Sequence, residues 1–111
     1  SKLVLIGVVH FHTNDYFLDP FDRKTIAEVR EKAIAQGAKQ VIVKGNTDVM
    51  KGVDNMWLSQ ARAEAVSKYL RSKGFKPMVL AAWYSYHKPI ALGRSQRALA
   101  LNRRVEIYIR Y

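Results

Sequence analysis

Four short runs of apolar and β-branched residues alternate with two long stretches of helical periodicity, and this alternation limits the folds open to the chain. The runs are residues 3–10, 40–44, 78–83 and 103–109. Between them, residues 20–36 and 54–72 repeat apolar side chains every three or four positions. Strands interleaved with amphipathic helices favour an α/β sandwich, in which helices pack against one mixed sheet.

The helix boundaries carry recognisable end signals. Asp19 followed by Pro20 is typical of a helix start, and Gly37 is typical of a helix end. The second helix is expected from near Asp54 to Ser72, and a short third helix from Ser95 to Leu101. The spacing predicts two core stripes: Ile26, Val29 and Ala33 on the first helix, and Leu58, Ala61, Ala65 and Tyr69 on the second.

The length of the chain limits the number of domains, and its net charge limits the kinds of binding partner. At 111 residues the chain is expected to form a single domain spanning 1–111. The absence of cysteine excludes disulfides, and a net charge of +10 favours a polyanionic partner such as nucleic acid, anionic lipid or a carboxylate-rich wall polymer. The opening apolar segment is too short to cross a bilayer. Because the chain begins at Ser1, we expect a domain excised from a larger protein.

Polar residues on the second predicted helix form a pattern of their own. Asn55, Ser59 and Arg62 stand at i, i+4 and i+7 and therefore share one face. That face begins just after a loop that carries Thr47 and Asp48, so an acid from the loop and an arginine from the helix can approach each other. Spacing alone also allows a plainer interpretation, in which these are turn residues and a solvated arginine.

Three segments, in this order, carry a resemblance to a known family. They are Gly45-Asn46-Thr47-Asp48, Leu58-Ser59-Gln60-Ala61-Arg62-Ala63 and Asn102-Arg103-Arg104-Val105-Glu106-Ile107. The chain resembles the OmpA-like, or OmpA/MotB C-terminal, domain from about Val9 to Ile109. The resemblance implies an α/β (α+β sandwich) fold with two main helices and a short one on a mixed four-stranded sheet.

The resemblance also implies a function, namely non-enzymatic binding of peptidoglycan through diaminopimelate in its stem peptide. Asp48 would accept from the ammonium of diaminopimelate, and Arg62 would clamp its carboxylate through the planar guanidinium. Asn55 would contact the stem peptide, and Thr47 would position the loop. The domain would then tether an envelope protein to the cell wall in the periplasm of a Gram-negative bacterium. That parent would be an outer-membrane protein, a lipoprotein or a MotB-like stator subunit.

Further site residues follow from the same resemblance. One of Arg103 and Arg104 is expected at the ligand, because neighbouring strand residues point to opposite faces. The segment Phe11-His12-Thr13-Asn14 matches a loop that usually carries aspartate where this chain has His12, and Asn14 completes that loop. Since histidine titrates near physiological pH, we hypothesise pH-dependent binding, without a fixed sign.

Several departures from the family pattern bear on the site. Asn46 replaces the usual histidine or tyrosine, and Gly52 falls one place late, so Asp48 and Arg62 are fourteen positions apart instead of fifteen. The third loop, residues 83–89, is bulky and aromatic instead of glycine-rich. These changes leave open a degenerate family member that serves as a structural or partner-binding module.

Other classes of function are less favoured by the residues. His10, His12 and His87 could in principle hold a metal, but the absence of cysteine and of well-spaced carboxylates favours ordinary packed or exposed histidines, and no cofactor is expected. No RNA-recognition signature and no nucleophile motif is present, which disfavours a nucleic-acid partner and an enzyme. Peptidoglycan is the expected partner, and homodimer formation is left open.

Overall fold

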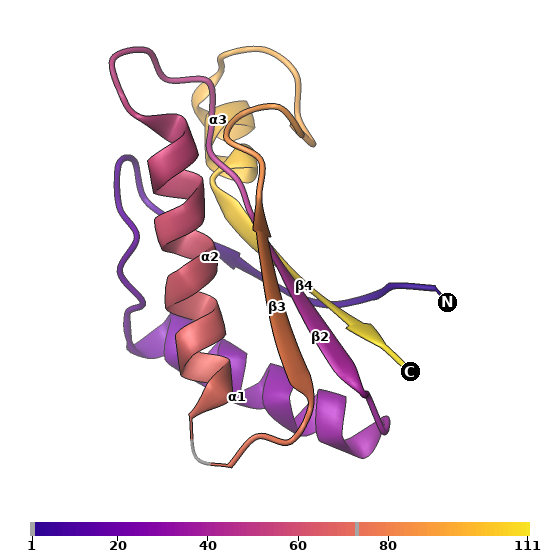
Figure 1. Cartoon of the computed structure of the whole chain (residues 1–111). Helices are drawn as coiled ribbons and strands as arrows, with labels where there is room; N and C mark the ends of the chain where they lie inside the picture. The colour runs from indigo at the N-terminus through magenta and orange to yellow at the C-terminus, as the bar shows by residue number, and fades with distance from the viewer. Residues whose placement is uncertain (1, 73) are drawn as a thin grey trace.

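The computed structural model describes residues 2–72 and 74–111, and these contain strands and helices in strict alternation (Figure 1). The elements are β1 (Val4–His10), α1 (Pro20–Ala35), β2 (Gln40–Gly45), α2 (Asn55–Arg71), β3 (Met78–Trp83), α3 (Gln96–Asn102) and β4 (Arg104–Arg110). Every element predicted from the sequence is present, with boundaries that differ by at most one residue.

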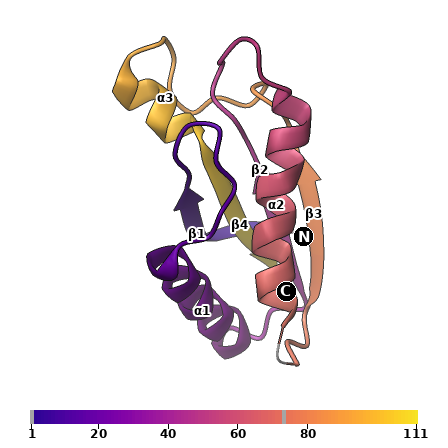
Figure 2. The same cartoon turned by 90° about the vertical axis from the view of Figure 1, so that its left-hand side faces the viewer.

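The strands form one mixed sheet in the order β1-β4-β2-β3. β4 pairs antiparallel with β1 and with β2, whereas β2 and β3 are parallel and are joined through α2. Helices α1 and α2 cover one face of this sheet, and α3 lies at its end (Figure 2). The predicted α/β sandwich, with two main helices and a short one on a mixed four-stranded sheet, is confirmed.

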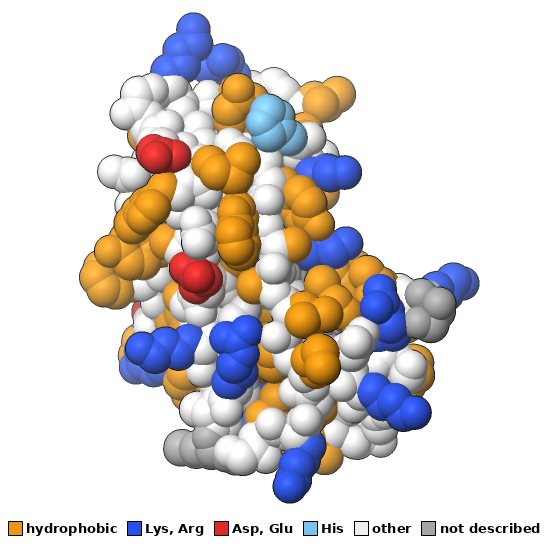
Figure 3. All heavy atoms as spheres, in the orientation of Figure 1, with side chains coloured by type: hydrophobic (Ala, Val, Ile, Leu, Met, Phe, Trp, Pro, Cys, Tyr) orange, Lys and Arg blue, Asp and Glu red, His pale blue; other side chains and the backbone are white. Residues whose placement is uncertain are grey.

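The core lies between the sheet and the two long helices. Val105, Ile107 and Ile109 of β4 are fully buried on the face that the helices cover, as the alternation of that strand predicts. The predicted inward stripe of α1 is also buried, namely Ile26, Val29 and Ala33. The outer face of the sheet carries more polar side chains, and Lys and Arg are spread over the surface in Figure 3.

Local sequence accounts for the position of α1. Asp19 is the N-cap: its Oδ1 accepts from the Asp22 backbone N–H at 2.8 Å, and the Asp22 carboxylate accepts from the Asp19 N–H at 3.2 Å. This reciprocal capping box fixes the first turn of the helix. Gly37, at a φ of 67°, allows the chain to leave the helix after Gln36.

The predicted core stripe of α2 is wrong in phase. Leu58 is buried, but Ala61, Ala65 and Tyr69 are only partly buried. The face turned to the sheet instead carries Asn55, Ser59, Arg62, Ala63, Val66, Ser67 and Leu70. Several of these are polar, and the hydrogen bonds of Ser59 and Arg62 explain how they can be buried. A pattern of apolar residues alone could not identify this face.

Close approach of α2 to β2 requires the glycine at the end of that strand. A Cβ at Gly45 would collide with the main-chain oxygen of Ser59 and would lie 2.9 Å from the Cβ of Ala63. Helix backbone cannot move aside as a flexible side chain can. No helix among the described residues combines the length and the apolar character needed to cross a membrane.

We predict that Gly45→Ala lowers the free energy of unfolding by about 1–3 kcal/mol, because overpacking forces the helix off the sheet. Gly7→Ala is the comparison variant, since the added carbon would meet a side-chain methyl of Val29 and no helix backbone. Denaturant unfolding of both variants measures the two losses. A Gly45→Ala variant as stable as the parent would contradict the assigned helix contact.

Candidate functional site

Four connections meet at one end of the sheet. β1, β2 and β3 all end there, and β4 begins there, because His10 pairs with Arg104 while Gly45 pairs with Val105 and with Trp83. The loops formed by residues 11–19, 46–54 and 84–95 therefore gather at this end, beside the junction of α3 and β4. The sequence-predicted site residues all lie on these connections, in the N-terminal half of α2, or where α3 meets β4.

Arg62 is fully buried beneath these loops and holds two of them together. Its Nε donates to the carbonyl of Asp15 at 2.8 Å, its Nη1 to that of Asn46 at 3.0 Å and its Nη2 to that of His12 at 3.2 Å. The guanidinium also lies 5.2 Å from the centre of the Phe11 ring. One side chain thus fixes the backbone of the β1–α1 loop against the start of the β2–α2 loop.

Burial determines the electrostatics of Arg62. Desolvation lowers the pKa of Arg62 to about 10, Asp48 opposes this shift, Arg103 adds to it, and Asp15 opposes it. The guanidinium therefore remains charged at neutral pH. Its charge is compensated by nearby carboxylates and by the dipoles of three carbonyl groups.

Asp48 forms its ion pair with Arg103, and its charge also acts on the guanidinium of Arg62, which the sequence predicted could approach it. Its Oδ2 lies 3.2 Å from Nη1 of Arg103, with side-chain exposures of 6% for the aspartate and 13% for the arginine. Its Oδ1 accepts from the backbone N–H of Met50 at 3.1 Å. Arg103 in turn donates from Nε to the carbonyl of Phe11 at 2.8 Å. The cation closest to the surface at this site is therefore Arg103.

The neighbouring side chains of Arg103 and Arg104 point to opposite sides of the chain, as the alternation of strand residues predicts. Arg103 faces Asp48, whereas Arg104 pairs with Glu106 at 2.9 Å and donates to the carbonyls of Asn102 and Lys88. Arg104 is buried on the other side of the strand and is not part of the cluster around Asp48. The structure thus distinguishes a pair that the sequence left undecided.

Thr47 and Asn55 shape the loop that carries Asp48. The Thr47 hydroxyl donates to the Asp48 carbonyl at 2.9 Å, and the Thr47 N–H donates to the Ser85 carbonyl at 2.9 Å. Asn55 donates from its side chain to the Met50 carbonyl at 2.9 Å, and its buried Oδ1 has no hydrogen-bond partner among the described residues. That oxygen is an acceptor that a bound molecule could use.

The β1–α1 loop presents the remaining predicted residues. His12 and Asn14 are both exposed, and Asn14 adopts a φ of 57° at the tip of the loop. Tyr86 of the aromatic third loop lines two hollows, one together with Asn55 and the other together with Thr47. Within residues 2–72 and 74–111, no three His, Cys, Asp or Glu side chains are grouped closely enough to hold a metal ion.

Two organising residues were not identified as such from the sequence. Ser59 accepts from the Ser85 N–H at 3.0 Å and donates to the Met56 carbonyl at 2.9 Å. Asn102 accepts from the N–H groups of Ile90 and Ala91 and donates to the Ala91 carbonyl. Both side chains fasten the third loop to the scaffold. Ser59 and Asn102 both stand in the motif segments that carry the family resemblance, and this was the one sign of their importance in the sequence. The sequence does not show which distant backbone groups such short polar side chains will bond.

Comparison with known proteins gives a consistent result. The model of the OmpA family matches residues 10–103. Outer membrane protein A of Bordetella avium is 35% identical over 98% of this chain and 57% of its own length. The peptidoglycan-associated lipoprotein of Pseudomonas putida is 35% identical over 96% of this chain and 65% of its own length. The chain thus spans less than two thirds of these relatives.

Solved structures agree with the architecture. The C-terminal domain of Helicobacter pylori MotB superposes with a TM-score of 0.83 over 96% of this chain and 86% of that chain, at 24% identity. At this level of identity the likeness concerns the fold, which therefore matches the one predicted from the sequence.

We predict that Arg62→Ala lowers the free energy of unfolding by about 3–5 kcal/mol, because three carbonyl groups lose a charged donor and a cavity is left. Arg62→Lys recovers only part of this loss, since one ammonium cannot reproduce the planar donors that reach both loops. Urea unfolding of the two variants tests this. An alanine variant as stable as the parent would show that the loops are held by other contacts.

Proposed function

Because the chain belongs to the OmpA family, we propose that it binds peptidoglycan and so anchors a larger envelope protein to the cell wall. The names of its relatives support this proposal, since several are peptidoglycan-associated lipoproteins. The same relatives support a periplasmic location in a Gram-negative bacterium. We infer a binding function without catalysis, because the cluster around Asp48 consists of recognition groups and contains no paired nucleophile and base.

The observation that carries the proposal is the ion pair of Asp48 and Arg103 where the loops converge. Diaminopimelate ends in an ammonium and a carboxylate on the same carbon, so its recognition requires an anion and a cation side by side. Asp48 offers the anion: each of its oxygens accepts one hydrogen bond within the protein and has capacity for another. Arg103 offers the cation.

This assignment changes the role that the resemblance implied for Arg62. A residue with no exposed surface and three bonds to carbonyl groups cannot clamp a ligand in this conformation. We assign the carboxylate of diaminopimelate to Arg103 and regard Arg62 as the positioning residue behind it. If the His12 carbonyl moves aside on binding, Nη2 of Arg62 becomes a second donor to the same carboxylate.

We expect Asp48→Asn and Arg103→Gln each to weaken binding to isolated sacculi, since one charge-assisted hydrogen bond contributes about 1.5–3 kcal/mol, or roughly ten- to a hundredfold. Lys68→Gln is the control for Arg103→Gln, because it removes one positive charge from an exposed position near the other end of α2. Co-sedimentation at a fixed salt concentration gives the measurement. Equal pelleting of all four proteins would mean adsorption through net charge and would refute the site.

We also propose that wall binding depends on pH through His12, whose side chain is exposed beside the site. The variant His12→Asn is a clean test, because Arg62 bonds to the main-chain carbonyl of residue 12 and not to its imidazole. Binding of the parent should differ between mildly acidic and neutral pH, whereas that of His12→Asn should change much less. A parent whose affinity stays constant across this range would disprove the idea.

A further inference from the structure

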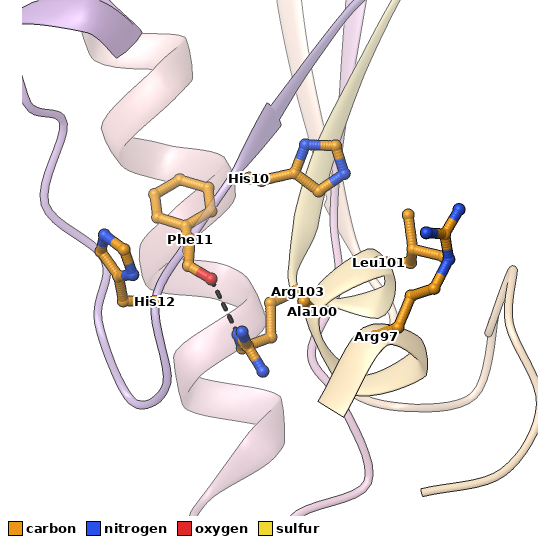
Figure 4. A pocket seen from close by; sticks show the side chains of 7 residues that line it. All are labelled: His10, Phe11, His12, Arg97, Ala100, Leu101 and Arg103. Carbon is orange, nitrogen blue, oxygen red and sulfur yellow. Dashed lines mark hydrogen bonds between the residues drawn. The ribbon is translucent and has the colours of Figure 1, made fainter. Parts of the chain in front are cut away.

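A hollow of about 440 Å³ separates the end of β1 from α3 and reaches the site described above (Figure 4). We call it the α3 hollow. Its walls come from three places in the chain: the residues at and after the end of β1, one side of α3, and the residue that joins α3 to β4. They are His10, Phe11, His12, Arg97, Ala100, Leu101 and Arg103.

The lining combines basic groups with an apolar surface. Arg97, Arg103 and the two histidines supply the polar atoms, and no carboxylate is among the lining residues. Phe11, Ala100 and Leu101 supply the apolar part. Such a lining favours an anionic group attached to a carbon chain, because the low-dielectric wall strengthens the attraction of the cations.

Charges outside the lining leave this preference in place. The pKa of His10 is lowered by partial burial, then by Arg104 and Arg103, and is raised by Asp22 of α1. Asp22 also interacts with His12, which lowers the pKa of the aspartate against the larger effect of its own burial. Asp22 is therefore the carboxylate whose charge acts on both histidines, while two arginines, Arg97 and Arg103, line the hollow.

Arg103 connects the α3 hollow to the diaminopimelate site. Its Nη1 pairs with Asp48 and its Nε donates to the Phe11 carbonyl, while the same side chain lines the hollow. A neighbouring group of a ligand bound at Arg103 can therefore extend into the hollow. In a wall peptide, the residue that precedes diaminopimelate is a glutamate linked through its side chain, which leaves its α-carboxylate free.

We propose that the α3 hollow binds a second carboxylate of the stem peptide, the free α-carboxylate of the glutamate next to diaminopimelate. This inference rests on the proposed function and adds a subsite to it. Arg97 is the principal cation for this carboxylate, with Arg103 shared between both groups. The methylene groups of the glutamate lie against Leu101 and Ala100.

The same arrangement gives the pH dependence a direction. Protonation of His10, whose pKa is lowered chiefly by burial, adds positive charge to the hollow as the pH falls, while a peptide carboxylate with a pKa near 4 stays ionised at mildly acidic pH. Acidification from neutral pH therefore strengthens binding of a peptide with a free glutamate carboxylate. A peptide in which this group is amidated gains less.

The test uses two synthetic muropeptides that differ only in amidation of the glutamate α-carboxylate, titrated by calorimetry into the parent and into Arg97→Gln. Arg97 is exposed on α3, so its replacement leaves the core intact. For the parent we expect amidation to weaken binding roughly three- to tenfold, and for Arg97→Gln we expect little effect. Lys68→Gln is the control, because it removes one positive charge from an exposed position near the other end of α2.

The outcomes separate the two proposals. If the parent binds both peptides equally well, or if Arg97→Gln is as sensitive to amidation as the parent, the α3 hollow is not the carboxylate subsite, and the proposed function stands. If the parent binds neither peptide, and Asp48→Asn pellets with sacculi as the parent does, both proposals fail. Loss of the amidation effect in Arg97→Gln alone supports the subsite.

Discussion

The buried guanidinium of Arg62 is the constraint on which the rest of this end of the molecule depends. A charge without contact to water is costly unless its donors are satisfied, and here the acceptors are carbonyl groups of the β1–α1 loop and of Asn46. Those loops must therefore adopt backbone conformations that direct the carbonyls inward. Asp48 lies only two residues after Asn46, so the position of the Asn46 backbone also places the Asp48 carboxylate next to Arg103.

The resulting order of charges has a consequence for recognition. From the interior outward the site presents Arg62, then Asp48, then Arg103, and the α3 hollow adds Arg97 beyond it. Asp48 stands between Arg62 and Arg103, and Asp15 is a second carboxylate whose charge acts on Arg62, so the three arginines still outnumber these two acids. A ligand with one ammonium and more than one carboxylate complements this order better than a simple zwitterion does. The overall charge of +10 would speed the encounter with such a polymer, while the local order selects among its groups.

The sequence was sufficient for the fold because local signals and periodicity agreed. The capping residues of α1 and the alternation of β4 each specified an element without help from distant parts of the chain. The site was harder to predict from the sequence. The inner face of α2 is partly polar, so apolar periodicity placed the core stripe on Ala61 and Ala65 instead of Ala63 and Val66. The pairing of Asp48 with Arg103 depends on where the short helix α3 ends, one residue before Arg103, and helix ends are set by tertiary contacts that a sequence pattern does not contain.

The same structure explains how the loops can depart from the family pattern while the framework persists. Arg62 contacts main-chain oxygens at residues 12, 15 and 46, so the framework requires a backbone path and not a particular side chain at these positions. His12 and Asn46 can therefore replace other residues without disturbing the buried arginine. The loop from Asp48 to α2 can likewise shorten, because Asn55 closes it through the Met50 carbonyl and Gly52 turns at a φ of 78°. Substitutions at the rim are therefore expected to alter recognition more than folding, and position 12 is such a place, because its exposed side chain lines the α3 hollow beside Arg103.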